Sequence, residues 1–342
     1  MNLDFTGEQQ ALHDTLREFF EKESPPAVVR AAEPLGFDPA LWQQVAGLGL
    51  AAMAVPEERG GGGAGFAELA IAAELLGQSL APVPLIEAAV ATRLLASLDD
   101  PPRLEPLLAG RQLATLALHP VTGDVARLVP AGAVADLVVL LRGDELLLAG
   151  QPDKPMAAIP NLGAMPLADC PVPDGAVLLA RGAAAVAAHR RAVRQWLLLT
   201  GAALAGLAAR ALAIGVGYVL QRTAFGVLIG SFQTIQHRLA DNATDIEGAR
   251  VLAYRAAWAH DAQRPDAASL AMMSFLFASE TAFKTASESL HFHGGYGYTL
   301  EYDIQLYFRR AKAWPLVAGD RRAAYAGLAH ELYAAPAHDE GA

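Results

Sequence analysis

The fold of this chain is decided by the stretch His291-Phe292-His293-Gly294-Gly295-Tyr296-Gly297-Tyr298, which lies in its last third. A second glycine-bearing stretch precedes it, running Arg222-Thr223-Ala224-Phe225-Gly226 and continuing to Gln233. Each stretch has an ordinary interpretation when it is taken alone. The residues 222–226 could be a simple helix C-terminus, because glycine is common there. His291 and His293 could be structural histidines, because a metal site needs more than two ligands and no third stands out nearby. We therefore expect no metal.

Composition indicates a large protein with extensive buried helix interfaces. Hydrophobic residues make up 53% of the 342 residues and charged residues only 18%, which is more apolar than an average soluble domain. A chain of this length can form two or three domains. The formal net charge of −10 argues against a nucleic-acid-binding surface. Cys170 is the only cysteine, so there is no intrachain disulfide and no cysteine cluster for a metal.

Positive charge is gathered locally in two clusters. The first cluster contains Arg181, Arg190, Arg191 and Arg194, and the second contains Arg309, Arg310, Lys312, Arg321 and Arg322. Clusters of this kind suit a phosphorylated small molecule. A solvated helix face is the competing interpretation for both of them.

The pattern of apolar residues changes twice along the chain. Residues 1–109 have helical spacing and form a predicted N-terminal α-helical domain, in which Thr6 with Gln9 matches a capping box and Asp38-Pro39 matches a helix start. Residues 110–182 alternate short apolar runs with Gly, Pro and Asp turns, which predicts a small β domain. Helical spacing returns over 183–335 and predicts a C-terminal bundle. The predicted fold class is therefore mainly α with a small β domain.

The longest apolar run, residues 197–220, is nearly as long as a membrane span. Arg210 lies near its middle and four glycines interrupt it, and a charge at the centre of a bilayer is costly. We therefore expect a buried bundle helix and no membrane. Residues 1–23 contain no basic segment followed by an apolar core, so no signal peptide is expected. These features predict a cytoplasmic protein.

Together, the stretches 222–233 and 291–312 resemble the C-terminal domain of the acyl-CoA dehydrogenase family. Glycine placement and spacing both match, and the second stretch ends in the family-like sequence Arg-Arg-Ala-Lys. Weaker similarities cover residues 5–20, 41–49, 55–58 and 74–77. The resemblance implies a helical N-terminal domain, a middle β domain that is reduced here, and a C-terminal helical bundle. The periodicity of the sequence predicts the same order.

Members of the family dehydrogenate an acyl-CoA thioester between its α and β carbons, with a carboxylate as base and FAD as hydride acceptor. The resemblance implies that Arg222 faces the FAD diphosphate, and that Phe225 and Gln233 contact the cofactor. It also implies a cofactor-binding segment contributed by a neighbouring subunit, made of His291, Phe292, His293, Gly294 and Gly295. Arginine offers a fixed fork of donors to a diphosphate. Glycine lets backbone N–H groups approach phosphate oxygens closely.

Three features depart from the family pattern. The position that often carries the catalytic glutamate is Ala318, which cannot accept a proton. An alternative position on the first long helix of the bundle is also empty, because no Asp or Glu occurs between Asp174 and Asp241. The β domain is short and lacks the family's flavin-facing segments. Asp320 and Glu247 remain as candidates for a displaced base, which must reach the α proton.

These departures favour a short subunit without a base that assembles with a longer, catalytically complete paralogue. The arrangement resembles the heteromeric acyl-CoA dehydrogenases of bacterial sterol side-chain breakdown. It implies an acyl-CoA substrate, with a steroid side-chain thioester suggested by analogy, and an electron-transfer flavoprotein as electron acceptor. Two other hypotheses stay open: a self-sufficient homomeric enzyme with a displaced base, and a flavin-free structural subunit.

Overall fold

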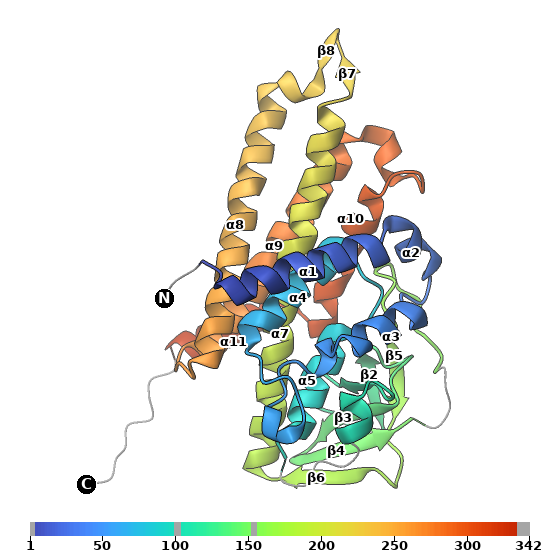
Figure 1. The fold of residues 1–342 in the computed structure, drawn as a ribbon, viewed down its shortest axis with the longest axis vertical. Helices are drawn as coiled ribbons and strands as arrows, with labels where there is room; N and C mark the ends of the chain where they lie inside the picture. The colour runs from blue at the N-terminus through green and yellow to red at the C-terminus, as the bar shows by residue number, and fades with distance from the viewer. Residues whose placement is uncertain (1–3, 99–103, 152–155, 334–342) are drawn as a thin grey trace, which may run out of the picture.

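The computed structural model describes residues 4–98, 104–151 and 156–333. Helices dominate it, and the strands of the one larger sheet gather at one end of the molecule (Figure 1). The long C-terminal helices run from this end to the opposite tip. The predicted fold class, mainly α with a small β region, is confirmed.

The N-terminal part is helical as predicted. Its helices are α1 (Gly7–Glu23), α2 (Pro26–Ala31), α3 (Pro39–Gly47), η1 (Leu50–Ala52), η2 (Glu57–Arg59), α4 (Phe66–Ser79), α5 (Leu85–Ala96) and α6 (Leu104–Leu108). The capping box at the start of α1 is confirmed, because the Thr6 hydroxyl accepts from the Gln9 N–H at 3.2 Å and the Gln9 side chain accepts from the Thr6 N–H. The Asp38 carboxylate caps α3 by accepting from the first backbone N–H groups of that helix.

The strands lie between residues 114 and 181. They are β1 (Ala114–Leu116), β2 (Val125–Val129), β3 (Leu137–Arg142), β4 (Glu145–Gly150), β5 (Ala168–Pro171) and β6 (Val177–Arg181). A four-stranded sheet has the order β1-β3-β4-β6, in which β1 pairs parallel with β3 and the other pairs are antiparallel. Strands β2 and β5 form a separate antiparallel ribbon.

Strand β3 is buried on both faces. Leu137, Val139 and Leu141 pack into the large core shared with the helices. Val138 and Leu140 alternate with them and pack into a smaller core with the β2–β5 ribbon. This double burial explains why β3 reads in the sequence as a continuous apolar run.

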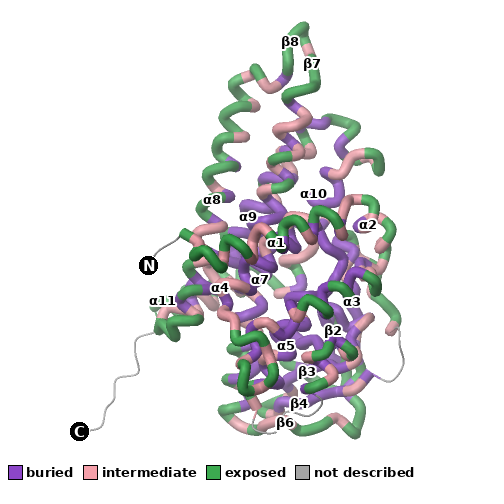
Figure 2. Tube along the Cα trace, viewed as in Figure 1, coloured by how far each residue is buried: buried purple, intermediate pink, exposed green. Residues whose placement is uncertain are grey.

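The C-terminal part is a bundle of long helices. Its elements are α7 (Ala183–Val219), β7 (Thr223–Ala224), β8 (Val227–Leu228), η3 (Ile229–Ser231), α8 (Gln233–Asp261), α9 (Ala267–Phe292), η4 (Gly294–Tyr298), α10 (Ile304–Ala313), η5 (Trp314–Ala318) and α11 (Arg321–Tyr333). The purple core of Figure 2 follows α7 and α9 through the middle of the molecule.

Helix α7 crosses α4 at backbone contact. A Cβ atom on Gly77 of α4 would lie 1.8 Å from the Ala203 carbonyl oxygen, and one on Gly206 of α7 would lie 1.9 Å from the Glu74 carbonyl oxygen. Only glycine permits this approach at either position. Three of the four glycines that interrupt the apolar run, Gly201, Gly206 and Gly215, therefore serve close helix packing.

Among the described residues, α7 is the one helix long and apolar enough to cross a membrane. Its most apolar window has a mean hydropathy of 1.9, and 67% of that window is buried inside the protein. The apolar run is a core helix here, as the sequence predicts.

The predicted bundle also contains a short hairpin that the sequence analysis did not predict. Strands β7 and β8 form a short hairpin between α7 and α8, at the tip farthest from the sheet (Figure 1). Its turn residues Phe225 and Gly226 have φ values of 53° and 81°. Left-handed backbone cannot continue a helix, and glycine adopts it without strain.

Candidate functional site

The two glycine-bearing stretches meet at the tip of the bundle. Phe292 packs against Val219 and Ile229, which flank the β7–β8 hairpin in the chain. The Tyr218 hydroxyl also donates to the His293 carbonyl oxygen at 3.4 Å. Two segments that lie some seventy positions apart in the sequence are thus in contact. This contact is expected if both segments contribute to the predicted cofactor site.

His293 is a buried structural residue. Its Nδ1 lies 2.7 Å from the Ser289 carbonyl oxygen, and its ring stacks on Tyr218 with centroids 4.0 Å apart. Burial lowers the pKa of His293, although the hydrogen bond to Ser289 partly opposes this effect. A neutral imidazole follows, with Nδ1 as the hydrogen-bond donor.

His291 is exposed while His293 is buried, so the two do not converge on a common point. Within the described ranges, no group of three His, Cys, Asp or Glu side chains could hold a metal ion. The structure offers no support for a metal pair here.

The other residues of the predicted cofactor site face outward. Arg222 and Gln233 are exposed, and Phe225 is 97% exposed at the hairpin turn. Figure 2 shows this tip as mostly exposed. No ion pair of Arg222 is found in the part of the chain that the structure describes. The hairpin thus presents an exposed phenylalanine and an exposed arginine on one short segment, and their role in cofactor binding stays a prediction.

The backbone of the second stretch is equally open. Gly294 has φ of 61°, and a Cβ atom on either Gly294 or Gly295 would meet nothing within 4 Å. Both residues are exposed.

Ala318 ends η5 and lines a pocket of about 190 Å³. The pocket is lined by Leu118, His119, Val193, Trp196, Leu197, Met272, Phe275, Leu276, Ala318 and Ala324. His119 Nε2 lies 2.9 Å from the Val317 carbonyl oxygen, which fixes η5 against the end of the sheet region. None of these lining residues is an Asp or a Glu. On this side the position of the expected base thus faces no carboxylate, whereas on the other side Ala318 lines a groove that also contains Asp245, Glu280 and Asp320.

Neither candidate for a displaced base lines this pocket. The Asp320 carboxylate accepts from the Arg322 N–H at 3.0 Å and so caps α11, although Asp320 does line the neighbouring groove with Ala318. Glu247 is exposed on α8 and binds Arg250 at 3.1 Å. Asp320 lies near Ala318, but its carboxylate already accepts the hydrogen bond that caps α11. Glu247 takes part in a surface ion pair with Arg250.

The second basic cluster is divided among separate partners. Arg309 and Arg310 both bind the Glu33 carboxylate, at 2.7 and 3.2 Å. Arg321 pairs with Glu280, and Lys312 lies over the Phe283 ring. Lys312 and Arg321 nevertheless line one groove, so the interpretation of this cluster as a phosphate site stays a prediction. The charges cluster in sequence but contact different elements of the fold.

The sequence analysis missed a buried acid, Glu87. Its Oε1 accepts a hydrogen bond from Trp196 Nε1 at 3.0 Å. Burial raises the pKa of Glu87, while the bond to Trp196 acts in the opposite direction. One signal was visible in the sequence, because residues 85–92 are otherwise uncharged and mostly apolar.

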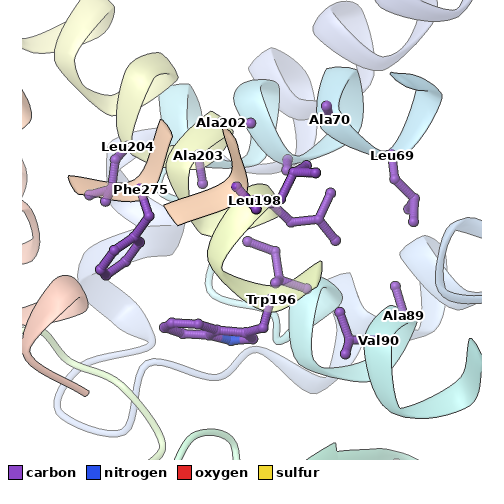
Figure 3. Packing of buried hydrophobic residues seen from close by; sticks show 14 of the residues in the cluster. Leu69, Ala70, Ala89, Val90, Trp196, Leu198, Ala202, Ala203, Leu204 and Phe275 are labelled. Carbon is purple, nitrogen blue, oxygen red and sulfur yellow. The ribbon is translucent and has the colours of Figure 1, made fainter. Parts of the chain in front are cut away.

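Trp196 lies at the centre of the large core. Figure 3 shows its ring below Phe275 of α9, and the two ring centroids lie 6.1 Å apart. Trp196 lines both the Ala318 pocket and a second cavity that holds Glu87. Trp196 is therefore a lining residue common to the Ala318 pocket and the Glu87 cavity.

Comparison with known proteins agrees with this architecture. The family model "Acyl-CoA dehydrogenase, N-terminal domain" matches residues 6–98, and "Acyl-CoA dehydrogenase, C-terminal domain" matches residues 181–326. The chain is 32% identical over 335 residues to acyl-CoA dehydrogenase IpdE2 of Mycolicibacterium smegmatis, covering 95% of this chain and 99% of that protein. It is 33% identical over 338 residues to IpdE2 of Mycobacterium tuberculosis, covering 96% and 98%.

Solved structures show the same fold. A chain of the ChsE4-ChsE5 complex from Mycobacterium tuberculosis superposes with a TM-score of 0.85 at 25% identity, covering 98% of this chain and 100% of that chain. A chain of the Tcur3481-Tcur3483 steroid ACAD G363A variant gives a TM-score of 0.83 at 27% identity, covering 95% and 97%. The family models and the full-length relatives agree with each other, and the chain belongs to the acyl-CoA dehydrogenase family.

Proposed function

We propose that this chain is the subunit without a base in a heteromeric, cytoplasmic, FAD-dependent acyl-CoA dehydrogenase. The complex dehydrogenates an acyl-CoA thioester between its α and β carbons, with a steroid side-chain thioester as the substrate class and an electron-transfer flavoprotein as electron acceptor. The single observation that carries the proposal is Ala318 in a pocket whose lining contains no carboxylate. Proton abstraction needs a base within hydrogen-bond reach, and this pocket offers none.

The residues at the bundle tip fit FAD. Arg222 presents a guanidinium that has no ion pair among the described residues, and Gly294 and Gly295 are exposed with open space where a side chain would stand. Phe225 offers an uncovered ring. When bound, FAD supplies the acceptor for the hydride that leaves the β carbon. In this proposal the tip holds one part of the cofactor, and the partner subunit supplies the rest of the pocket together with the base.

A heteromeric assembly is supported by two observations. Apolar side chains stand exposed at and around the tip, including Leu220, Phe225, Val227 and Leu228. Such a patch marks an interface on a soluble protein. The two structural neighbours described above also carry double names, ChsE4-ChsE5 and Tcur3481-Tcur3483.

The visible absorption spectrum tests the proposal. The chain is purified alone and also after co-expression with a longer paralogue that carries the glutamate, and acyl-CoA thioesters are added to each. We expect flavin bleaching only in the co-expressed complex. A flavin-loaded homomer that bleaches with a thioester would overturn the assignment as a subunit without a base.

Flavin content tests the cofactor site without any assay of turnover. In the complex, Arg222→Ala should lower the FAD bound per complex, because the variant removes the donors facing the diphosphate. The matched control is Arg127→Ala, which removes an exposed arginine that binds Asp169 in the strand region. Unchanged flavin content in Arg222→Ala would favour the flavin-free structural subunit.

A second function is favoured by the position of Asp320. This side chain lines the groove that also contains Ala318, so a homomeric enzyme could use it as a displaced base. It would first have to leave the Arg322 N–H that it caps. Loss of turnover in Asp320→Asn would establish this second function.

A further inference from the structure

A separate groove of about 280 Å³ lies where the second half of α1, the start of α2, the end of α4, the middle of α7 and α10 converge. It shares Leu80 with the Glu87 cavity, but none of the polar side chains that line that cavity. Its walls are largely apolar and include Phe20, Val29, Leu75, Leu80 and Leu306.

Arg210, the charge near the middle of the apolar run of α7, lines this groove and is exposed. Its guanidinium lies beside the Tyr307 hydroxyl, which donates to the Gln78 carbonyl oxygen at 2.9 Å. Burial raises the pKa of Tyr307 to about 12, and the nearby guanidinium opposes this rise. In the part of the chain that the structure describes, Arg210 forms no ion pair. A guanidinium has five N–H donors, so Arg210 can bind an anion that enters the groove.

A second guanidinium lines the same groove from α1. Arg17 lies 3.5 Å from the Asp14 carboxylate, one turn earlier on its own helix. The same carboxylate oxygen accepts from the Gln10 amide at 3.1 Å and lies 3.2 Å from His13 Nδ1. Asp14 is therefore a shared partner, and an exposed ion pair of this kind contributes little stability. Arg17 and Arg210 thus bring two positive charges to one groove, where a bound anion would compensate their repulsion.

The other lining residues limit the kind of anion. Glu21 lines the groove one turn after Arg17 on α1, so the charged side chains of the lining carry a net charge of +1. A single carboxylate neutralises this charge, and the planar fork of an arginine matches a carboxylate. A phosphate dianion would exceed the positive charge and be repelled by Glu21. The apolar walls in turn favour a ligand with a hydrocarbon body over a small hydrated ion.

We propose that this groove binds a free medium-chain fatty acid, with its carboxylate held by Arg17 and Arg210 and its hydrocarbon chain against the apolar walls. The site goes beyond the proposed function, because it needs neither the base nor the flavin nor a CoA group. The fatty acid binds there without chemical change. The Ala318 pocket and the bundle tip take no part in this binding.

Calorimetric titration of the purified full-length chain at neutral pH tests the proposal. The probes are octanoate, 1-octanol, acetate and inorganic phosphate. We expect octanoate to bind at least about tenfold more tightly than each of the others, because only octanoate combines one negative charge with an apolar body. Equal affinity for octanoate and 1-octanol, tighter binding of phosphate, or no binding of octanoate would each overturn the proposal.

Variants assign the binding to this groove. Arg210→Met and Arg17→Met should each weaken octanoate binding about tenfold, while Arg210→Lys should retain part of it as a point charge. Circular dichroism checks that the variants are folded, as expected for exposed residues. The matched control is Arg190→Met, which removes an exposed arginine about 30 Å away along the same helix. Octanoate binding that survives both groove substitutions, or that falls equally in Arg190→Met, would refute the assignment. The flavin content and bleaching of the complex are read separately, so the two proposals can fail independently.

Discussion

At the scale of single residues, a methyl group stands where the family resemblance places a carboxylate. Ala318 is half-buried beside Trp196 and Phe275, and the nearest acid in sequence, Asp320, caps the following helix instead. The proposed lack of a base is therefore reinforced by the hydrogen bond that Asp320 makes.

This cap leads to a prediction for Asp320. Replacement by Ala should lower the free energy of unfolding by about 1 kcal/mol, because the Arg322 N–H loses its acceptor. Replacement by Asn keeps an acceptor and should cost less. Chemical denaturation measures both values. Turnover of the complex should be unchanged in the Asn variant, and a loss of turnover there would contradict a purely structural role.

Glu33 gives a prediction about pH. Burial by itself would raise the pKa of Glu33, but Arg309 and Arg310 outweigh it and hold the pKa below its usual range. A lowered pKa in the folded state means that the ionised group contributes stability above the unfolded pKa, and that this contribution is lost as pH falls through the folded pKa. The free energy of unfolding of the wild type should therefore exceed that of Glu33→Gln. This difference should be largest near neutral pH and should shrink below about pH 4.

At neutral pH, Glu33→Gln should cost roughly 2–4 kcal/mol, because it leaves the guanidinium of Arg310, 2% exposed, without its counter-charge. Denaturation curves recorded from acidic to neutral pH measure the difference. The matched control is Glu105→Gln, which breaks an exposed ion pair with Arg111 and should change stability by less than about 1 kcal/mol. A difference that is independent of pH would refute the argument.

At the scale of helices and strands, the molecule depends on the crossing of α4 and α7. Glycines on both helices allow their backbones to touch, which brings Trp196 and Thr200 of α7 close to α5 and the cavity. The crossing therefore positions the walls of the Glu87 cavity as well as the core.

Gly206→Ala should destabilise the protein by about 1–3 kcal/mol or more, because the new methyl group would lie 1.9 Å from a carbonyl oxygen. Gly217→Ala on the same helix meets nothing within 4 Å and should be neutral or stabilising by up to about 1 kcal/mol. Thermal unfolding of the two variants separates packing from helix propensity. Equal effects at both positions would show that the close crossing contributes little.

At the scale of the whole molecule, the bundle tip farthest from the sheet carries exposed aromatic and apolar side chains. Phe225 is 97% exposed there, and Tyr296, Tyr298 and Leu300, which follow the second glycine-bearing stretch, are also exposed. Exposed apolar surface of this kind is typical of an interaction site. In the proposed function, the partner subunit buries it.

Phe225→Ser should leave the fold intact and weaken the assembly, since an exposed turn residue contributes little to the stability of the free chain. Sedimentation of the complex measures the shift towards smaller species. The matched control is Leu162→Ser, which changes a residue 69% exposed in a loop of the strand region. Unchanged assembly in Phe225→Ser would place the interface elsewhere.

The sequence predicted most of the architecture because its signals are local. Helical spacing, the capping box at Thr6 and the alternation of turns report on neighbouring residues, and the structure confirms them. The β7–β8 hairpin was missed because two-residue strands leave almost no periodic signal. The roles assigned to Arg222 and to the 291–295 segment stay predictions.

The sequence by itself determined the family, the fold class and the presence of alanine at position 318, because these depend on residue identity and short-range pattern. Only the tertiary structure decided which charges find partners. Glu33 meets Arg310 from 277 positions away, and Glu87 meets Trp196 from 109 positions away. Such contacts arise when helices pack, and burial then sets both the charge of each group and whether it faces a cavity.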